Sequence, residues 1–123
     1  MADTKVVFIA FAIEDVTMRD FLKGHTLHPK NPYEYVDMSV KEAYSSDWKE
    51  KVRTRIKRSD GVIVLMSKNS TASSGQKWEI QCGKEEKKKI YGLWCYTDDR
   101  TAVDGITGHV WTWDGVGGFI DSL

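Results

Sequence analysis

The chain has 123 residues, and its 18 basic and 18 acidic side chains cancel at neutral pH. This length predicts a single domain, residues 1–123, and 41% apolar with 29% charged residues is typical of a globular protein. The charge balance disfavours a uniformly basic nucleic-acid binder and a polybasic membrane-binding protein. The longest apolar run is too short to span a bilayer, and Cys82 and Cys95 provide no disulfide framework or zinc spacing. We therefore expect a soluble, cytoplasmic protein without a metal.

Five segments are predicted to be strands. Residues 6–11 form a near-continuous apolar run, which is typical of a strand buried on both faces of a parallel sheet. Residues 62–66 and 90–96 have the same character. Residues 33–38 and 109–113 are weaker candidates.

Three segments with helical periodicity lie between the strands, at about residues 15–24, 46–59 and 74–88. In the second segment, Trp48, Val52 and Ile56 recur every four residues, as expected for one buried face. The third segment carries a predicted stripe of Trp78, Gln81, Cys82 and Glu85. Cys82 and Cys95 are expected to be inert core thiols.

The alternation of strands and helices predicts right-handed crossovers and a parallel sheet. Five strands in this length indicate an α/β fold of the flavodoxin-like type, with strand order 2-1-3-4-5 and helices flanking the sheet. Residues 115–118, with three glycines, are expected to form a turn, and the last helix to be stunted, from Phe119 to Leu123. Residues 24–32 are expected to form a surface loop.

In such a sheet, ligands bind beyond the carboxyl ends of the strands where the strand order reverses, here between the first and third strands. No Gly-x-Gly-x-x-Gly motif follows a strand, and no phosphate-binding Gly-Lys-Ser/Thr loop is present. The acidic pair Glu14-Asp15 follows the first strand, as in the metal pocket of a phosphoacceptor receiver. However, Met66-Ser67 stands where a receiver requires an aspartate. These chemistries are therefore disfavoured.

One constellation remains at this edge of the sheet. Residues 67–75, rich in serine, lead from the third strand into a helix whose second turn carries Trp78-Glu79. The hydroxyls, backbone N–H groups and helix N-terminus predict an anion site, and burial of Glu79 would raise its pKa or fix its geometry. A capping loop followed by an ordinary helical glutamate is the alternative interpretation, and spacing alone leaves both open.

These same residues resemble a known family. The segments Asp47-Trp48, Ser59-Asp60-Gly61-Val62-Ile63-Val64-Leu65 and Trp78-Glu79-Ile80 are similar to the TIR-like (Toll/interleukin-receptor-like) domains of the Thoeris antiphage defence system. The chain also resembles their flavodoxin-like relatives of unknown activity. The similarity extends over about residues 5–96, and the segment beyond Thr97 matches little. One departure is that Trp78 is adjacent to Glu79, whereas many TIR NAD⁺ hydrolases place the aromatic residue a full turn earlier.

The resemblance implies an enzyme that consumes NAD⁺ as substrate, with no cofactor or metal. It would release nicotinamide and make a cyclic ADP-ribose isomer, a diffusible signal that activates a separate effector. Glu79 matches the essential glutamate of the family. The remaining substrate-binding residues expected on this basis are Phe11 and Ala12 as a floor, Trp78 as a wall, Thr71 and Ser74 near ribose or phosphate, and Asp37 or Ser45 at the border.

Two other functions remain open. The first is a non-catalytic interaction module, since signalling TIR domains assemble through their faces, and self-association is expected on either interpretation. The second is nucleoside transfer at an N-glycosidic bond, because that chemistry also uses a glutamate on a similar fold.

Overall fold

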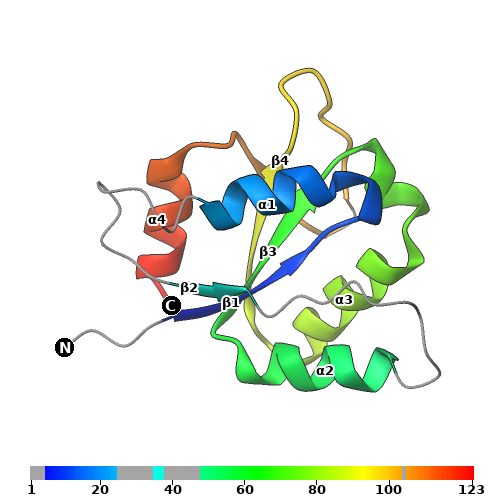
Figure 1. Ribbon diagram of the computed structural model, residues 1–123, viewed down its shortest axis with the longest axis vertical. Coiled ribbons are helices and arrows are strands. Elements are labelled where there is room, and N and C mark those ends of the chain that lie inside the picture. The colour runs from blue at the N-terminus through cyan, green and yellow to red at the C-terminus, as the bar shows by residue number, and fades with distance from the viewer. Residues whose placement is uncertain (1–4, 25–34, 38–47, 104) are drawn as a thin grey trace.

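The computed structural model describes residues 5–24, 35–37, 48–103 and 105–123 (Figure 1). Within these ranges the strands are β1 (Lys5–Ala10), β2 (Tyr35–Asp37), β3 (Gly61–Met66), β4 (Lys89–Trp94) and β5 (Gly108–His109). The α-helices are α1 (Val16–Gly24), α2 (Trp48–Arg58), α3 (Ser74–Glu85) and α4 (Trp113–Asp121). Two 3₁₀ segments, η1 (Ile13–Asp15) and η3 (Lys68–Ala72), precede α1 and α3.

The strands form one parallel sheet in the order β2-β1-β3-β4-β5, which confirms the predicted α/β class and strand order. β3 lies at the centre, where it pairs with β1 over four residues and with β4 over six. The edges are short: β2 has three residues, and β5 has only two. Four strands therefore make up nearly all of the sheet, and the fifth is reduced to two residue pairs with β4.

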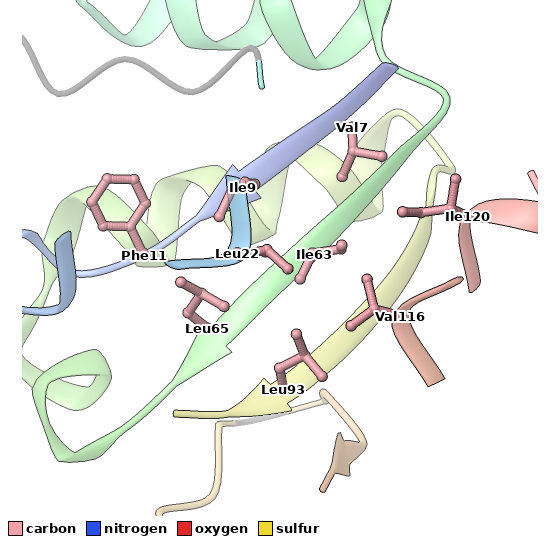
Figure 2. Close-up of a cluster of buried hydrophobic side chains, with 9 residues drawn as sticks. All are labelled: Val7, Ile9, Phe11, Leu22, Ile63, Leu65, Leu93, Val116 and Ile120. Atoms are coloured by element: carbon pink, nitrogen blue, oxygen red, sulfur yellow. The ribbon is translucent and has the colours of Figure 1, made fainter. Parts of the chain in front are cut away.

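Alternate residues of the central strands face two separate helical layers. Figure 2 shows one layer, in which Val7 and Ile9 of β1 and Ile63 of β3 pack against α1 and α4. The other layer contains their neighbours Phe8 and Val62, packed against α2 and α3. β1 and β3 are buried on both faces, because right-handed crossovers place helices on either side of a parallel sheet.

The C-terminal part differs from the sequence prediction. The expected strand at 109–113 is present only as far as His109, and the expected turn at 115–118 lies inside α4. Glycines disfavour helices, but here the hydroxyl of Thr112 caps the first turn by accepting the N–H of Gly115 at 3.0 Å. Val116 and Ile120 then bury one face of the helix in the core, which outweighs the low propensity.

The buried face of α3 also differs from the predicted stripe. Cys82 is buried and Trp78 half-buried, but Gln81 and Glu85 are exposed. The side that faces the sheet instead carries Gly75, Gln76, Glu79, Ile80, Cys82 and Gly83. A polar glutamine and a carboxylate thus occupy positions that a pattern of apolar residues does not reveal.

The predicted loop at 24–32 lies outside the described residues except for Gly24, the last residue of α1. Across the described ranges, none of the helices has the length and apolar character that a membrane crossing requires.

Candidate functional site

The sheet has one switch point, which lies where the sequence predicts it. β1 is flanked by β2 on one side and by β3 on the other, so the chain leaves the carboxyl end of β1 in one direction and that of β3 in the other. Ligands of open parallel sheets bind beyond these carboxyl ends. The segments that follow Ala10 and Met66 therefore border the expected ligand site.

Glu79 is buried on the sheet-facing side of α3, with 1% of its surface exposed. α3 begins at the carboxyl end of the sheet and runs back along β3, since Gln76 contacts Leu65 and Gly83 packs on Val62. Glu79 lies three residues after Gln76 and four before Gly83, on the same side of the helix as both. Glu79 is thus buried on the sheet-facing side of α3, about one turn along the helix from Gln76.

Gln76 joins the two strands at the switch point. Its side-chain Nε2 donates to the carbonyl of Ala10 at 3.1 Å and to that of Leu65 at 2.7 Å. Gln76 is fully buried, and its own backbone N–H is capped by the hydroxyl of Ser73 at 3.1 Å. Sequence reasoning missed this residue, because glutamine is common on helices and nothing in the spacing distinguishes it from an exposed one.

Trp78 points from α3 toward α2 rather than into the sheet. Its indole N–H donates to the carbonyl of Lys49 at 3.4 Å. The Lys49 ammonium lies 5.0 Å and the Arg53 guanidinium 5.4 Å from the ring centroid, within the range of cation–π attraction. Arg53 also pairs with Glu85 at 2.6 Å and Glu86 at 2.9 Å, so the aromatic ring and these charges hold α2 against α3.

The hydroxyls of the serine-rich loop are already occupied by hydrogen bonds within the protein. Ser67 Oγ accepts the N–H of Asn69, and Ser70 Oγ accepts the N–H of Ser67, both at 3.1 Å, which forms a capping box for η3. Ser73 Oγ caps α3 through Gln76. These hydroxyls accept from the loop's own backbone, and those of Ser67 and Ser70 also donate to Asp15 and to the Leu65 carbonyl. The capping interpretation therefore explains them better than the anion-site prediction.

A second buried carboxylate lies on the other side of this loop. Asp15 is 0% exposed and accepts hydrogen bonds from the Ser67 hydroxyl, the Asn69 amide and the Tyr96 hydroxyl. Its neighbour Glu14 is exposed. The two residues of the acidic pair after β1 therefore have different environments. Glu14 lies at the surface, whereas Asp15 connects the segments that follow β1, β3 and β4 through its hydrogen bonds.

Comparison with known protein families matches residues 8–100 to the family described as Thoeris protein ThsB, TIR-like domain. The chain belongs to this family. Membership over most of the chain makes it a TIR module of an antiphage defence system and confirms the resemblance to the Thoeris TIR-like domains. No curated protein matches the sequence.

Among solved structures, the TIR-like domain is similar to the TIR domain of the Toll-related receptor TRR-2 from Hydra magnipapillata. The TM-score is 0.62 at 16% sequence identity, over 94% of this chain and 91% of the Hydra domain. At this identity the likeness concerns the fold, which it identifies independently as that of a TIR domain.

The remaining substrate-binding residues implied by the resemblance are scattered in the TIR-like domain. Phe11 is fully buried in the layer of α1, under the Arg19 guanidinium at 5.2 Å, and so faces away from α3. Ala12 is buried at the start of the following turn, while Thr71 and Ser74 are exposed. The backbone of Asp37 ends β2, but its side chain and all of Ser45 lie outside the described residues.

Two hollows open on the described surface of the TIR-like domain. One of about 610 Å³ lies between η3 and the segment after β4, lined by Lys68, Asn69, Tyr96, Asp98, Asp99, Arg100 and Thr101. The other, of about 460 Å³, lies between α3, η3 and the segment after β4 and is lined by Ser70, Thr71, Lys77, Ile80, Gln81, Lys84, Ala102 and Val103. Glu79 lines neither of them. Within the described ranges, no group of three or more His, Cys, Asp or Glu side chains is arranged to hold a metal.

Proposed function

We propose that this TIR-like domain consumes NAD⁺, releases nicotinamide and forms a cyclic ADP-ribose isomer as a signal in Thoeris-type defence. Glu79 is the proposed catalytic residue. One observation carries the proposal: Glu79, which the resemblance matches to the family's essential glutamate, is buried on the same side of α3 as Gln76, whose amide contacts both β1 and β3. A solvated helical glutamate, the alternative interpretation of the spacing, would instead be exposed.

The burial of Glu79 suits the proposed chemistry. Departure of nicotinamide leaves an oxocarbenium-like ribose, and a nearby carboxylate stabilises that cation most strongly where water is excluded. The same carboxylate oxygens accept hydrogen bonds from ribose hydroxyls and so orient the sugar. If water is excluded and a hydroxyl of the adenosine ribose is held at attack distance, that hydroxyl forms the new bond and cyclisation replaces hydrolysis.

The proposal is tested by incubating the protein with NAD⁺ and following nicotinamide and ADP-ribose products by mass spectrometry. We expect a cyclic product from the wild type and a loss of roughly 10²-fold or more in turnover for Glu79→Gln, which retains the shape of the side chain but not its charge. Glu50→Gln is the control, because Glu50 is an exposed carboxylate on the neighbouring helix α2. Equal turnover in wild type and Glu79→Gln would remove Glu79 from the mechanism.

The assay is best run on assembled protein, since we also propose that the domain self-associates and signals to a separate effector. Light scattering at the assay concentration reports the assembly state. Addition of phage-infected lysate supplies a trigger. If no product forms under any of these conditions while the protein assembles, the non-catalytic interaction module becomes the better description.

A further inference from the structure

Gln76 is the only buried side-chain amide that the described part of the chain places at the switch point. Ala10 is the last residue of β1, and Leu65 is the penultimate residue of β3. Both carbonyls accept a hydrogen bond from the same Nε2. The first turn of α3 is thereby attached to the two strands at the edge where the sheet ends.

The two carbonyl acceptors determine which way the Gln76 side-chain amide is oriented. The Nε2 atom must be the one that faces two carbonyl acceptors, because an oxygen there would be repelled by both. The Oε1 atom is buried and has no hydrogen-bond partner among the described residues. An unpaired buried acceptor reduces stability, and such departures from full hydrogen bonding are expected at functional sites.

The attachment of Gln76 controls the location of Glu79. The Gln76 main chain is fixed by the Ser73 hydroxyl, and its side chain is fixed by the strands, so the first turn is held at both ends. Glu79 follows three residues later on the same face. A shift or rotation of this turn would move the Glu79 carboxylate with it, because the helix backbone between them is rigid.

We infer that Gln76 is a positioning residue for Glu79: its amide docks α3 on the carboxyl ends of β1 and β3 and thereby sets the location of the carboxylate. The inference rests on the proposed function of Glu79 in NAD⁺ cleavage. Displacement of a catalytic group by about 1 Å lowers turnover by roughly 100-fold, so a docking amide one turn away has a large effect without contacting the substrate.

The first test compares Gln76→Met and Gln76→Glu with the same changes at Gln81, an exposed glutamine on α3. Gln76→Met retains the length of the side chain but removes both donor bonds. We expect kcat to fall roughly 10- to 100-fold while KM changes by less than about threefold. Gln81→Met and Gln81→Glu should remain close to wild type in both parameters. Circular dichroism at the assay temperature establishes that each variant is folded.

Gln76→Glu provides a readout that a purely space-filling role would not give. At neutral pH its carboxylate faces two carbonyl oxygens and offers no donor. At lower pH the protonated carboxyl again donates one hydrogen bond. We therefore expect kcat of Gln76→Glu, divided by that of wild type at the same pH, to rise several-fold as the pH is lowered, and that of Gln76→Met to remain flat.

Failure of the proposed function and failure of the inference about Gln76 give different experimental results. If the wild type produces no nicotinamide under any condition, the proposed function fails, and amide hydrogen exchange then tests the docking itself. Loss of protection in the first two turns of α3 in Gln76→Met, but not in Gln81→Met, would support the role of Gln76. If instead the wild type turns over NAD⁺ and folded Gln76→Met retains kcat within about twofold, or if protection is unchanged, the inference is overturned.

Discussion

The carboxylate of Asp15 accepts a hydrogen bond from the hydroxyl of Ser67 at 2.5 Å, across 52 residues of sequence. Asp15 follows β1 and Ser67 follows β3, so the bond connects the two segments that leave the switch point. The Asn69 amide and the Tyr96 hydroxyl also donate to Asp15, each at 3.0 Å. Three neutral donors thus satisfy the buried carboxylate of Asp15, and its hydrogen bonds connect the segments that follow β1, β3 and β4.

Asp15→Asn is expected to destabilise the domain by about 1–3 kcal/mol, because the amide offers one acceptor oxygen where three donors converge and its NH₂ group faces other donors. Urea unfolding measures the loss. Asp20→Asn is the control, since Asp20 lies on α1 and its pair with Arg19 is exposed, and it should cost less than about 1 kcal/mol. Equal midpoints for the two variants would contradict a structural role for Asp15.

Two glycines should respond to alanine in opposite directions. A Cβ atom at Gly92, in β4, would lie 2.6 Å from the backbone oxygen of Thr107 and 2.7 Å from Met66 Sδ, so Gly92→Ala should cost about 1–3 kcal/mol. A Cβ at Gly118, in α4, has nothing within 4 Å, so Gly118→Ala should stabilise by about 0.5–1 kcal/mol through helix propensity. Thermal unfolding of both variants against wild type tests the pair, and the same sign of change for both would contradict it.

The end of α3 offers a further stabilising change. Lys88 N–H donates to the Gly83 carbonyl and Lys87 N–H to that of Lys84, the pair of bonds that defines a Schellman motif. This motif requires a left-handed residue, and Lys87 has φ 58°. Lys87→Gly should therefore stabilise by about 0.5–1 kcal/mol. Lys77→Gly, inside the same helix, should instead destabilise by about 1 kcal/mol, and denaturant midpoints distinguish the two.

The central part of the fold could be predicted from the sequence, because its signal is strong and local. The apolar runs of β1 and β3 are continuous, so they indicated strands buried on both faces. α4 could not be predicted, because the glycines at 115, 117 and 118 resemble a turn until the cap at Thr112 and the burial of Val116 and Ile120 are known. Tertiary contacts override local propensity at such a segment.

The candidate site could be predicted only in part. Glu79 was found through its family motif, and its burial on α3 is consistent with the role expected of it. Gln76 was not recognised, and Asp15 was noted only as half of an acidic pair. Each acts through groups distant in the sequence: Gln76 through Ala10, 66 positions away, and Asp15 through Tyr96, 81 positions away. The spacing of residues in the sequence does not reveal contacts between distant residues, because these contacts arise only from the order of the strands in the sheet.

Asp99 should contribute to the pH dependence of stability. Its pKa is lowered by hydrogen bonds from the Thr101 hydroxyl and from the Lys68 N–H. Because the folded pKa lies below the unfolded one, the stabilisation is present above the unfolded pKa, about 3.9, and is lost as the pH falls through the folded value.

Asp99→Asn should therefore be less stable than wild type at pH 6, and this difference should shrink below about pH 4. Urea midpoints across this range measure it. Asp98→Asn changes an exposed neighbouring carboxylate and should remain close to wild type throughout. A stability difference between wild type and Asp99→Asn that stays constant down to pH 2.5 would show that Asp99 does not provide this dependence.

Both thiols should be unreactive in the folded protein. Burial, together with the nearby charges of Asp15 and Asp99, raises the pKa of Cys95 to about 12. Burial also raises the pKa of Cys82, which is 0% exposed. At pH 8 the thiolate fraction of Cys95 would be about 10⁻⁴, against roughly a quarter for a free thiol, so its alkylation should slow by about three orders of magnitude.

Iodoacetamide labelling followed by mass spectrometry measures this protection, and Cys82→Ser and Cys95→Ser variants assign each rate to its thiol. Both thiols should label at the rate of a free cysteine once urea unfolds the chain, because the protection comes from burial and not from the local sequence. Rapid labelling of Cys95 in folded protein would mean that the segment after β4 opens readily. In that case the hydrogen bond from Tyr96 to Asp15 would not hold that segment closed.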